Sequence, residues 1–276
     1  MLAGIMMTAC TSPAPGEVIS SETERILQSE TTMETAAETT STSEAVTTAV
    51  TTTAEITTEA TTEAPKGALD GIKIGLDPGH QAHGNSEQEA IAPGSSQTKD
   101  KVTGGAVGVS TGIPEYVTVL EIAECLKDKL EAEGATVYMT RESHDVDISN
   151  QERTKMMNDY GVDLMLRIHC DASGSSEAKG VGLFVSESNA IAAQSYAYAE
   201  IIQPIVCEAI GAQNRGITQN DTYTGQNWAE VPCIMIECGF LSNPEEDQLL
   251  NDEAYQERLA EGICEGVKAC FAEREE

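Results

Sequence analysis

The chain has 276 residues, and its 46 acidic residues outnumber its 16 Lys and Arg residues, which gives a formal net charge of −30. This balance argues against nucleic-acid binding, which requires a basic surface, and against electrostatic docking on anionic lipids. The length allows one or two domains, and the first quarter of the chain differs in composition from the rest.

The first ten residues, MLAGIMMTAC, resemble the end of a bacterial lipoprotein signal. Thr8 and Ala9 are the small residues that precede the lipidated cysteine in such signals, so Cys10 is the predicted lipidation site. Met7 replaces the usual Leu, and no Lys or Arg precedes it. The alternative is an ordinary cysteine near the terminus. We interpret residues 1–10 as the remnant of a lipoprotein signal.

Residues 11–67 have the composition of a disordered linker. Thr fills about half of the positions from 31 to 62, interleaved with Glu and Ala and without an apolar period. Such a segment cannot bury enough apolar surface to offset the entropy lost on ordering. A linker of this kind would let a folded domain reach away from a membrane anchor.

From residue 68 to 276 short apolar runs alternate with segments of helical periodicity. The pattern predicts strands at 72–77, 135–140, 162–169, 180–186 and 231–240, and helices at 116–130, 149–160, 190–210 and 255–271. This alternation is typical of a single α/β domain with a mostly parallel, twisted sheet that helices cover on both faces.

Three polar residues fall at the ends of predicted strands, where α/β sheets carry their functional crevice. His80 follows the first strand, His169 ends another, and Glu237 lies near the end of the last. Each histidine has an alternative interpretation, as a turn residue for His80 and as a hydrogen-bonded core residue for His169. Glu237 is harder to explain as structural, because an ionised carboxylate in a buried strand is costly without a metal, a cation or several donors.

Glu115 begins the first long predicted helix. An acidic residue there is favoured by the helix dipole alone. However, two imidazoles and one carboxylate also form a three-ligand zinc site with a fourth position open for water. A further carboxylate, Glu237, could then orient the water and pass its proton to a leaving amine. Spacing alone does not decide this, because the chain contains no H-E-x-x-H motif.

Five segments together resemble the zinc-dependent N-acetylmuramoyl-L-alanine amidases of bacterial cell walls, in their strand-based zinc family. They are IGLDPGH, PEYVTVLEIAECLKDKL, VYMTRESHDVDISNQERTKMMN, DLMLRIHCDAS and VPCIMIECGFLSNPEEDQLL, in this order from about residue 71 to the C-terminus. The resemblance implies Zn²⁺ held by His80, Glu115 and His169, with Glu237 as catalytic acid/base. It also implies cleavage of the amide that joins N-acetylmuramic acid to the L-alanine of the stem peptide.

The chain departs from many such amidases in the long stretch between His80 and Glu115. Glu87 and Glu89 lie in this stretch and are alternative ligands, but its composition suggests a mobile loop. His83 and His144 are interpreted as loop residues, and Cys170 should face away from its neighbour His169.

The seven cysteines of this domain include no C-x-x-C pair, so a disulfide framework is not expected. Most of these cysteines should be small buried hydrophobic residues.

Two classes of function remain open. One is a peptidoglycan-hydrolysing zinc amidase, and the other is a non-catalytic cell-wall-binding module on the same fold. Retention of Glu237 beside the three candidate ligands favours the enzyme, since a binding module does not need it. We expect a monomer that acts on peptidoglycan outside the cytoplasm, at the cell envelope, either anchored by lipid or secreted to the wall.

Overall fold

The computed structural model describes residues 67–272. The predicted lipoprotein segment with Cys10 and residues 11–66 of the predicted linker lie outside this range. Within it, no helix is both long enough and apolar enough to cross a membrane.

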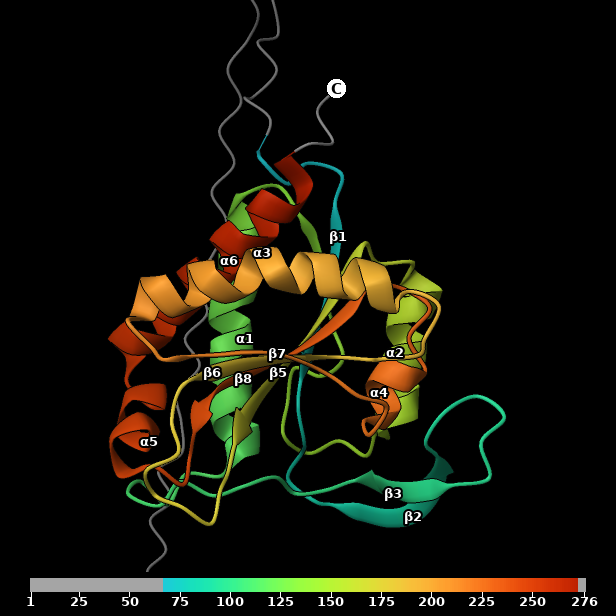
Figure 1. Ribbon diagram of the computed structural model, residues 1–276, viewed down its shortest axis with the longest axis horizontal. Helices are drawn as coiled ribbons and strands as arrows, with labels where there is room; N and C mark the ends of the chain where they lie inside the picture. The colour runs from blue at the N-terminus through green and yellow to red at the C-terminus, as the bar shows by residue number, and fades with distance from the viewer. Residues whose placement is uncertain (1–66, 273–276) are drawn as a thin grey trace, which may run out of the picture. The chain divides into compact units, whose positions relative to one another are not determined.

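A six-stranded sheet forms the centre of the described part (Figure 1). Its strands are β1 (Lys73–Pro78), β4 (Thr136–Met139), β5 (Leu164–Asp171), β6 (Val181–Val185), β7 (Asn214–Gln219) and β8 (Cys233–Phe240). The strand order is β4-β1-β5-β8-β6-β7, and only the β6–β8 pair is antiparallel. The predicted α/β fold with a mostly parallel sheet is therefore confirmed.

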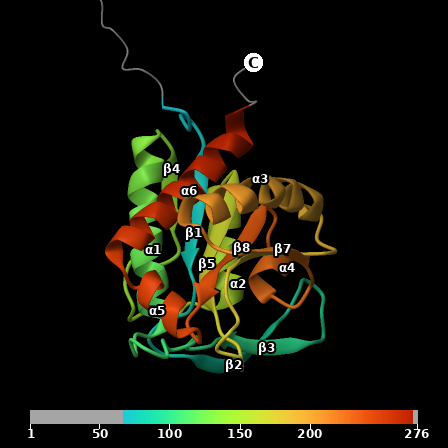
Figure 2. The same ribbon diagram turned by 60° about the vertical axis from the view of Figure 1, so that its left-hand side comes forward.

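Helices pack on both faces of this sheet (Figures 1 and 2). They are α1 (Glu115–Ala132), α2 (Asn150–Tyr160), α3 (Ala192–Ile210), α4 (Thr224–Asn227), α5 (Pro244–Leu250) and α6 (Glu253–Phe271). Helices α1, α3 and α6 contribute to the larger hydrophobic cluster, while α2 contributes to a smaller cluster on the opposite face.

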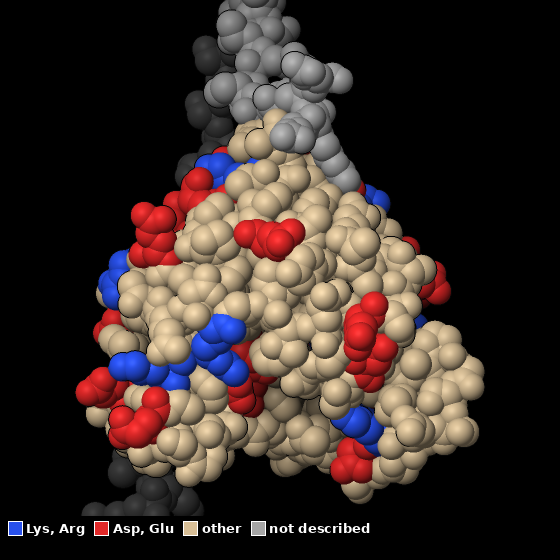
Figure 3. Space-filling view, viewed as in Figure 1, with Lys and Arg blue, Asp and Glu red and all other residues tan. Residues whose placement is uncertain are grey.

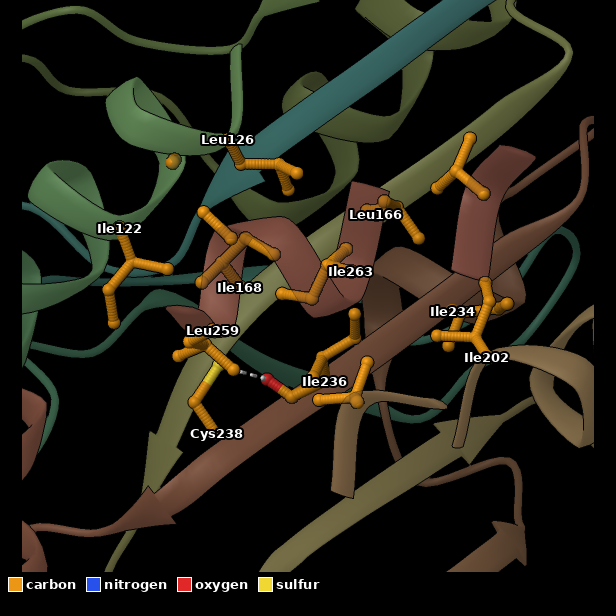
Figure 4. Close-up of a cluster of buried hydrophobic side chains, with 14 of the residues drawn as sticks. Ile122, Leu126, Leu166, Ile168, Ile202, Ile234, Ile236, Cys238, Leu259 and Ile263 are labelled. Carbon is orange, nitrogen blue, oxygen red and sulfur yellow. Dashed lines mark hydrogen bonds between the residues drawn. The ribbon is translucent and has the colours of Figure 1, made fainter. Parts of the chain in front are cut away.

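The alternation of side chains along the strands separates the two faces. Leu166 and Ile168 of β5 and Ile234 and Ile236 of β8 point into the larger cluster, where they meet α1, α3 and α6 (Figure 4). Met165, one residue out of phase, packs in the smaller cluster. His169 and Glu237 share the phase of Met165, so the α/β pattern places both on the face that α2 covers.

The long stretch after His80 is not the mobile loop that its composition suggested. It forms an antiparallel hairpin of β2 (Asn85–Ala90) and β3 (Thr98–Val102). Three side chains of the domain donate hydrogen bonds to backbone carbonyls of this hairpin and so hold it against the domain. Trp228 Nε1 donates to the Ala90 carbonyl at 2.8 Å, Asn227 Nδ2 to the Ile91 carbonyl at 3.0 Å, and Asn150 Nδ2 to the Lys101 carbonyl at 2.8 Å. The prediction of a mobile loop was wrong because the hairpin is held by hydrogen bonds to its backbone. Such bonds leave no apolar pattern in the sequence of the hairpin itself.

The seven cysteines of the described residues form no disulfide, and five of them are buried. Burial raises the pKa of the Cys233 thiol to about 12. The five buried cysteines therefore serve as small hydrophobic residues, as expected for most of the seven.

Candidate metal centre and active site

The segment that follows β1 is held by two arginines. Arg153 Nη1 donates to the Pro78 carbonyl at 2.9 Å and its Nη2 donates to the His80 carbonyl at 2.8 Å. Arg141 Nη2 donates to the Gly79 carbonyl at 2.9 Å. These bonds hold His80 in a left-handed conformation, with φ at 59°, which non-glycine residues rarely adopt. The orientation of His80 is therefore determined by the arginines rather than by local preference.

Gly79 allows the two histidines to approach each other. A Cβ atom at this position would lie 2.2 Å from Cε1 of His169, so any larger residue would displace the ring. The rings of His80 and His169 are 4.8 Å apart between centroids, in an edge-to-face arrangement. The glycine of the D-P-G-H segment is thus required by packing within the site.

A buried charge network lies beneath this segment. Asp77 accepts hydrogen bonds from Arg153 Nη1 at 3.0 Å, from Arg167 Nε at 2.8 Å and from the Thr140 hydroxyl at 2.7 Å. The side chains of Asp77 and Arg153 have no exposed area. Burial alone would raise the pKa of Asp77, but Arg167 and Arg153 hold it well below its usual range. The network therefore contains an ionised carboxylate between two guanidinium groups.

His80, Glu115 and His169 come together at the carboxyl ends of β1 and β5 and at the first residue of α1. Glu115 Oε1 lies 3.2 Å from His80 Nε2 and 3.2 Å from His169 Nδ1. One potential ligand atom from each residue lies within 4.8 Å of the others. Within residues 67–272, this is the one cluster of three such side chains.

The surroundings of the cluster suit a divalent metal. His80 Nδ1 lies 2.9 Å from the Thr103 carbonyl, an interaction that leaves Nε2 directed at the cluster. His169 Nε2 is buried and has no hydrogen-bond partner in the described part of the chain. Burial lowers the pKa of His169 to about 4, although its bond to Glu115 opposes this shift. Metal ligation requires a neutral imidazole, and the lowered pKa keeps His169 in this state at neutral pH.

Glu115 is fixed by backbone donors as well as by the histidines. Its Oε2 accepts from the Ala106 amide at 2.9 Å and its Oε1 from the Cys170 amide at 3.0 Å. Burial alone would raise the pKa of Glu115, but the hydrogen bonds with His169 and His80 hold it well below its usual range. This carboxylate is therefore ionised near neutral pH, in the state that binds metal.

Glu237 lies on β8 directly opposite His169 of β5. It is buried, and its Oε2 has no hydrogen-bond partner among the described residues. Burial, with the nearby carboxylates of Glu115 and Asp171, raises the pKa of Glu237 well above its usual range. Arg215 partly offsets this effect and donates to Asp171 Oδ2 at 2.8 Å. An unpartnered carboxyl group therefore stands beside the three-residue cluster.

The cluster and Glu237 line a cleft of about 690 Å³. The hairpin forms part of its wall through Gln88, Thr98, Lys99 and Asp100. In the view of Figure 3 the surface is hollowed beside the hairpin of Figure 1, and both basic and acidic side chains lie next to the hollow. The site is thus open to a large polar substrate.

The alternative ligands lie elsewhere. Glu87 pairs with Lys101 at 2.7 Å on the hairpin, and Glu89 accepts from the Gln151 amide in the first turn of α2. His144 lies against the ring of Tyr116, outside the cluster. Cys170 packs in the larger hydrophobic cluster, on the face opposite His169, as predicted.

Sequence reasoning missed the groups that support the site, namely the Asp77 network and Gly105. A Cβ atom on Gly105 would lie 2.8 Å from Glu115 Oε2 and 2.9 Å from the His80 ring. One signal was available, because Asp77 ends an apolar run and a buried carboxylate requires partners. The sequence did not indicate which of the arginines supply them.

The N-acetylmuramoyl-L-alanine amidase family known as Amidase_3 matches residues 74–269, which include all four candidate residues. The chain belongs to this family. The chain is also 32% identical over 204 residues to the probable cell wall amidase LytH of Staphylococcus aureus. That match covers 74% of this chain and 60% of LytH, so the chain spans about 60% of the length of this relative.

Solved structures agree with this membership. The N-acetylmuramoyl-L-alanine amidase from Clostridium difficile 630 superposes with a TM-score of 0.62 at 26% identity, over 74% of this chain and 98% of that one. Ami1 from Mycobacterium smegmatis gives a TM-score of 0.68 at 22% identity, over 74% and 99% of the two chains. At 22% identity, the similarity to Ami1 shows a shared fold only.

Proposed function

We propose that this amidase hydrolyses the bond between N-acetylmuramic acid and the L-alanine of the stem peptide in peptidoglycan, with Zn²⁺ as cofactor. The observation that carries the proposal is the cluster of His80, Glu115 and His169 beside the unpartnered carboxyl of Glu237, in one open cleft. The family match and the resemblance to LytH support the same reaction.

In this proposal His80, Glu115 and His169 hold the zinc. The metal would supply Lewis acidity for the attacking water and for the scissile carbonyl. The bond between His80 and the Thr103 carbonyl fixes the ring, and the two backbone amides fix Glu115. These contacts maintain the ligand set in one arrangement before substrate enters.

Glu237 is the proposed acid/base. Its Oε2 would accept a proton from the attacking water and then donate it to the departing L-alanine nitrogen, so that the carboxylate is regenerated. This cycle requires a carboxyl oxygen without a permanent partner, and Glu237 Oε2 has none among the described residues. The raised pKa of Glu237 is consistent with a group that holds a proton during part of the cycle.

A cell-wall substrate places the reaction outside the cytoplasm, at the cell envelope. We further propose that Cys10 carries a lipid anchor, that residues 11–67 serve as a spacer, and that the enzyme acts as a monomer. The sequence MLAGIMMTAC and the Thr/Glu-rich composition of the following segment support the first two parts of this proposal.

A product assay tests the activity against the second candidate, a non-catalytic wall-binding module. An amidase releases L-alanine amino termini from purified peptidoglycan without producing new reducing sugar ends. A module that only binds the wall would sediment with it and release neither product. The open cleft with an unpartnered Glu237 favours the amidase.

Substitution of a ligand should remove the metal. We expect the parent to contain about one zinc per chain, and His80→Ala or His169→Ala to lose most of it, because two remaining protein ligands hold zinc poorly. His83→Ala is the matched control, since this exposed histidine lies outside the cluster. Metal analysis after dialysis provides the measurement, and full zinc content in either ligand variant would show that the ligand set is wrong.

Deletion of residues 11–66 should leave turnover of soluble wall fragments within about twofold of the parent. The cleft is lined by residues between His80 and Glu237, and the composition of the deleted segment predicts no folded partner for them. Release of L-alanine amino termini from soluble fragments is the readout. A large loss of this activity would mean that the segment contributes to the site.

A further inference from the structure

The hairpin of β2 and β3 places one unneutralised cation in the cleft. Two cationic side chains line the cleft, Arg167 and Lys99. Arg167 is buried and paired with Asp77 at 2.8 Å, so its charge is already compensated. Lys99 is exposed, and its Nζ donates to the Thr222 carbonyl at 2.6 Å.

Lys99 retains donors for a ligand. An ammonium group has three N–H donors, and the Thr222 carbonyl, its one polar partner among residues 67–272, is neutral. Asp100, the adjacent acid, accepts from Gln88 within the hairpin. Lys101, two residues along the same strand, is instead neutralised by Glu87. The cleft therefore presents Lys99 with its charge uncompensated.

The rest of the cleft makes this charge significant. Its other ionisable side chains include the acidic groups of Asp100, Glu115, Asp171 and Glu237, and the whole chain carries a net charge of −30. An anionic substrate is repelled by such a field and gains attraction where a cation faces the cleft. Stem peptides of peptidoglycan are anionic, because they end in a carboxylate and can carry another along the chain.

We propose that Lys99 binds a free carboxylate of the stem peptide and so makes the enzyme discriminate against amidated peptides. This inference rests on the proposed amidase function and adds a specificity-determining residue to it. The bond to Thr222, on the turn between β7 and α4, holds the ammonium at the cleft wall. The hairpin thereby forms one wall of the substrate-binding cleft. Lys99 on this wall recognises the peptide part of the substrate rather than the sugar.

The test uses the full chain loaded with zinc and three matched muropeptide fragments. One fragment carries all its carboxylates, the second carries an amide on the residue after L-alanine, and the third carries an amide at the peptide C-terminus. For the parent we expect KM to be roughly three- to tenfold higher for one of the amidated fragments, the size of a solvated charge-assisted contact, with kcat little changed. The fragment that shows the increase identifies the carboxylate.

Lys99→Gln should abolish this difference in KM between fragments. The KM for the fragment that carries all its carboxylates should rise to that of the discriminated amidated fragment. Lys101→Gln is the matched control on the same strand and should retain the parent's discrimination.

The inference is overturned if the parent cleaves all three fragments with the same KM. It is also overturned if Lys99→Gln raises KM equally for all three, which would mean that the lysine only anchors the hairpin. A parent that releases no L-alanine amino termini from any fragment would instead contradict the proposed function, and this inference with it.

Discussion

Replacing Glu237 by Gln should leave the zinc bound and remove nearly all hydrolysis. Glutamine has the size of glutamate, but it can neither accept the proton of the attacking water nor donate one to the leaving nitrogen. Loss of a positioned acid/base typically lowers the rate about 10²- to 10⁴-fold, and we expect the upper end because an amine leaving group must be protonated. Zinc content, melting temperature and release of L-alanine amino termini should be measured on one sample.

The structure also predicts the stability of this variant. Glu237 is buried and its Oε2 has no hydrogen-bond partner among the described residues, so glutamine, which has the same size, removes no contact from the fold. The melting temperature should therefore not fall. If Glu237 only neutralised a nearby cation, the variant would be destabilised and its activity would follow the folded fraction.

Glu230→Gln, at an exposed position before β8, is the matched control and should behave as the parent. A folded, zinc-loaded Glu237→Gln protein with activity within a few-fold of the parent would exclude Glu237 from the mechanism.

The elements predicted from the sequence are those whose apolar residues follow the period of a helix or strand. Strand β5 and helix α6 were predicted because their buried side chains recur at spacings that follow from packing on one face. Strands β2, β3 and β7 were missed, since each buries at most one side chain and carries no such alternation. Burial against a core leaves a pattern in the sequence, whereas attachment through backbone hydrogen bonds does not.

The candidate site was partly predictable for a similar reason. His80, His169 and Glu237 fall at strand ends, and a parallel sheet brings these ends to one edge. The groups that orient them come from separate loops and helices. Arg153 of α2, for example, fixes the backbone of His80, and Thr103 of the loop after β3 fixes its ring. Long-range contacts of this kind depend on loop geometry, which residue spacing does not specify.

Breaking the buried charge network beneath His80 from one side should strongly destabilise the domain. Asp77→Asn leaves Arg153 and Arg167 without the carboxylate that both contact, and breaking a buried ion pair from one side typically costs about 3–5 kcal/mol. We expect a loss of this size in the free energy of unfolding, measured with urea on the full chain at pH 7. Asp159→Asn is the matched control, because this exposed residue of α2 should change stability by less than about 0.5 kcal/mol.

The pH dependence of this difference follows from the direction of the pKa shift. Although burial alone would raise the pKa of Asp77, the two arginines hold it below its usual range in the folded state. The unfolded chain therefore binds a proton near pH 4 that the folded protein does not, so the contribution of Asp77 is fully present above about pH 5 and declines as the pH falls below about 4. The parent should lose stability through that range, and the gap between parent and Asp77→Asn should narrow. A gap that stays constant from pH 7 to pH 3 would mean that the variant acts through lost packing rather than through the ionised carboxylate.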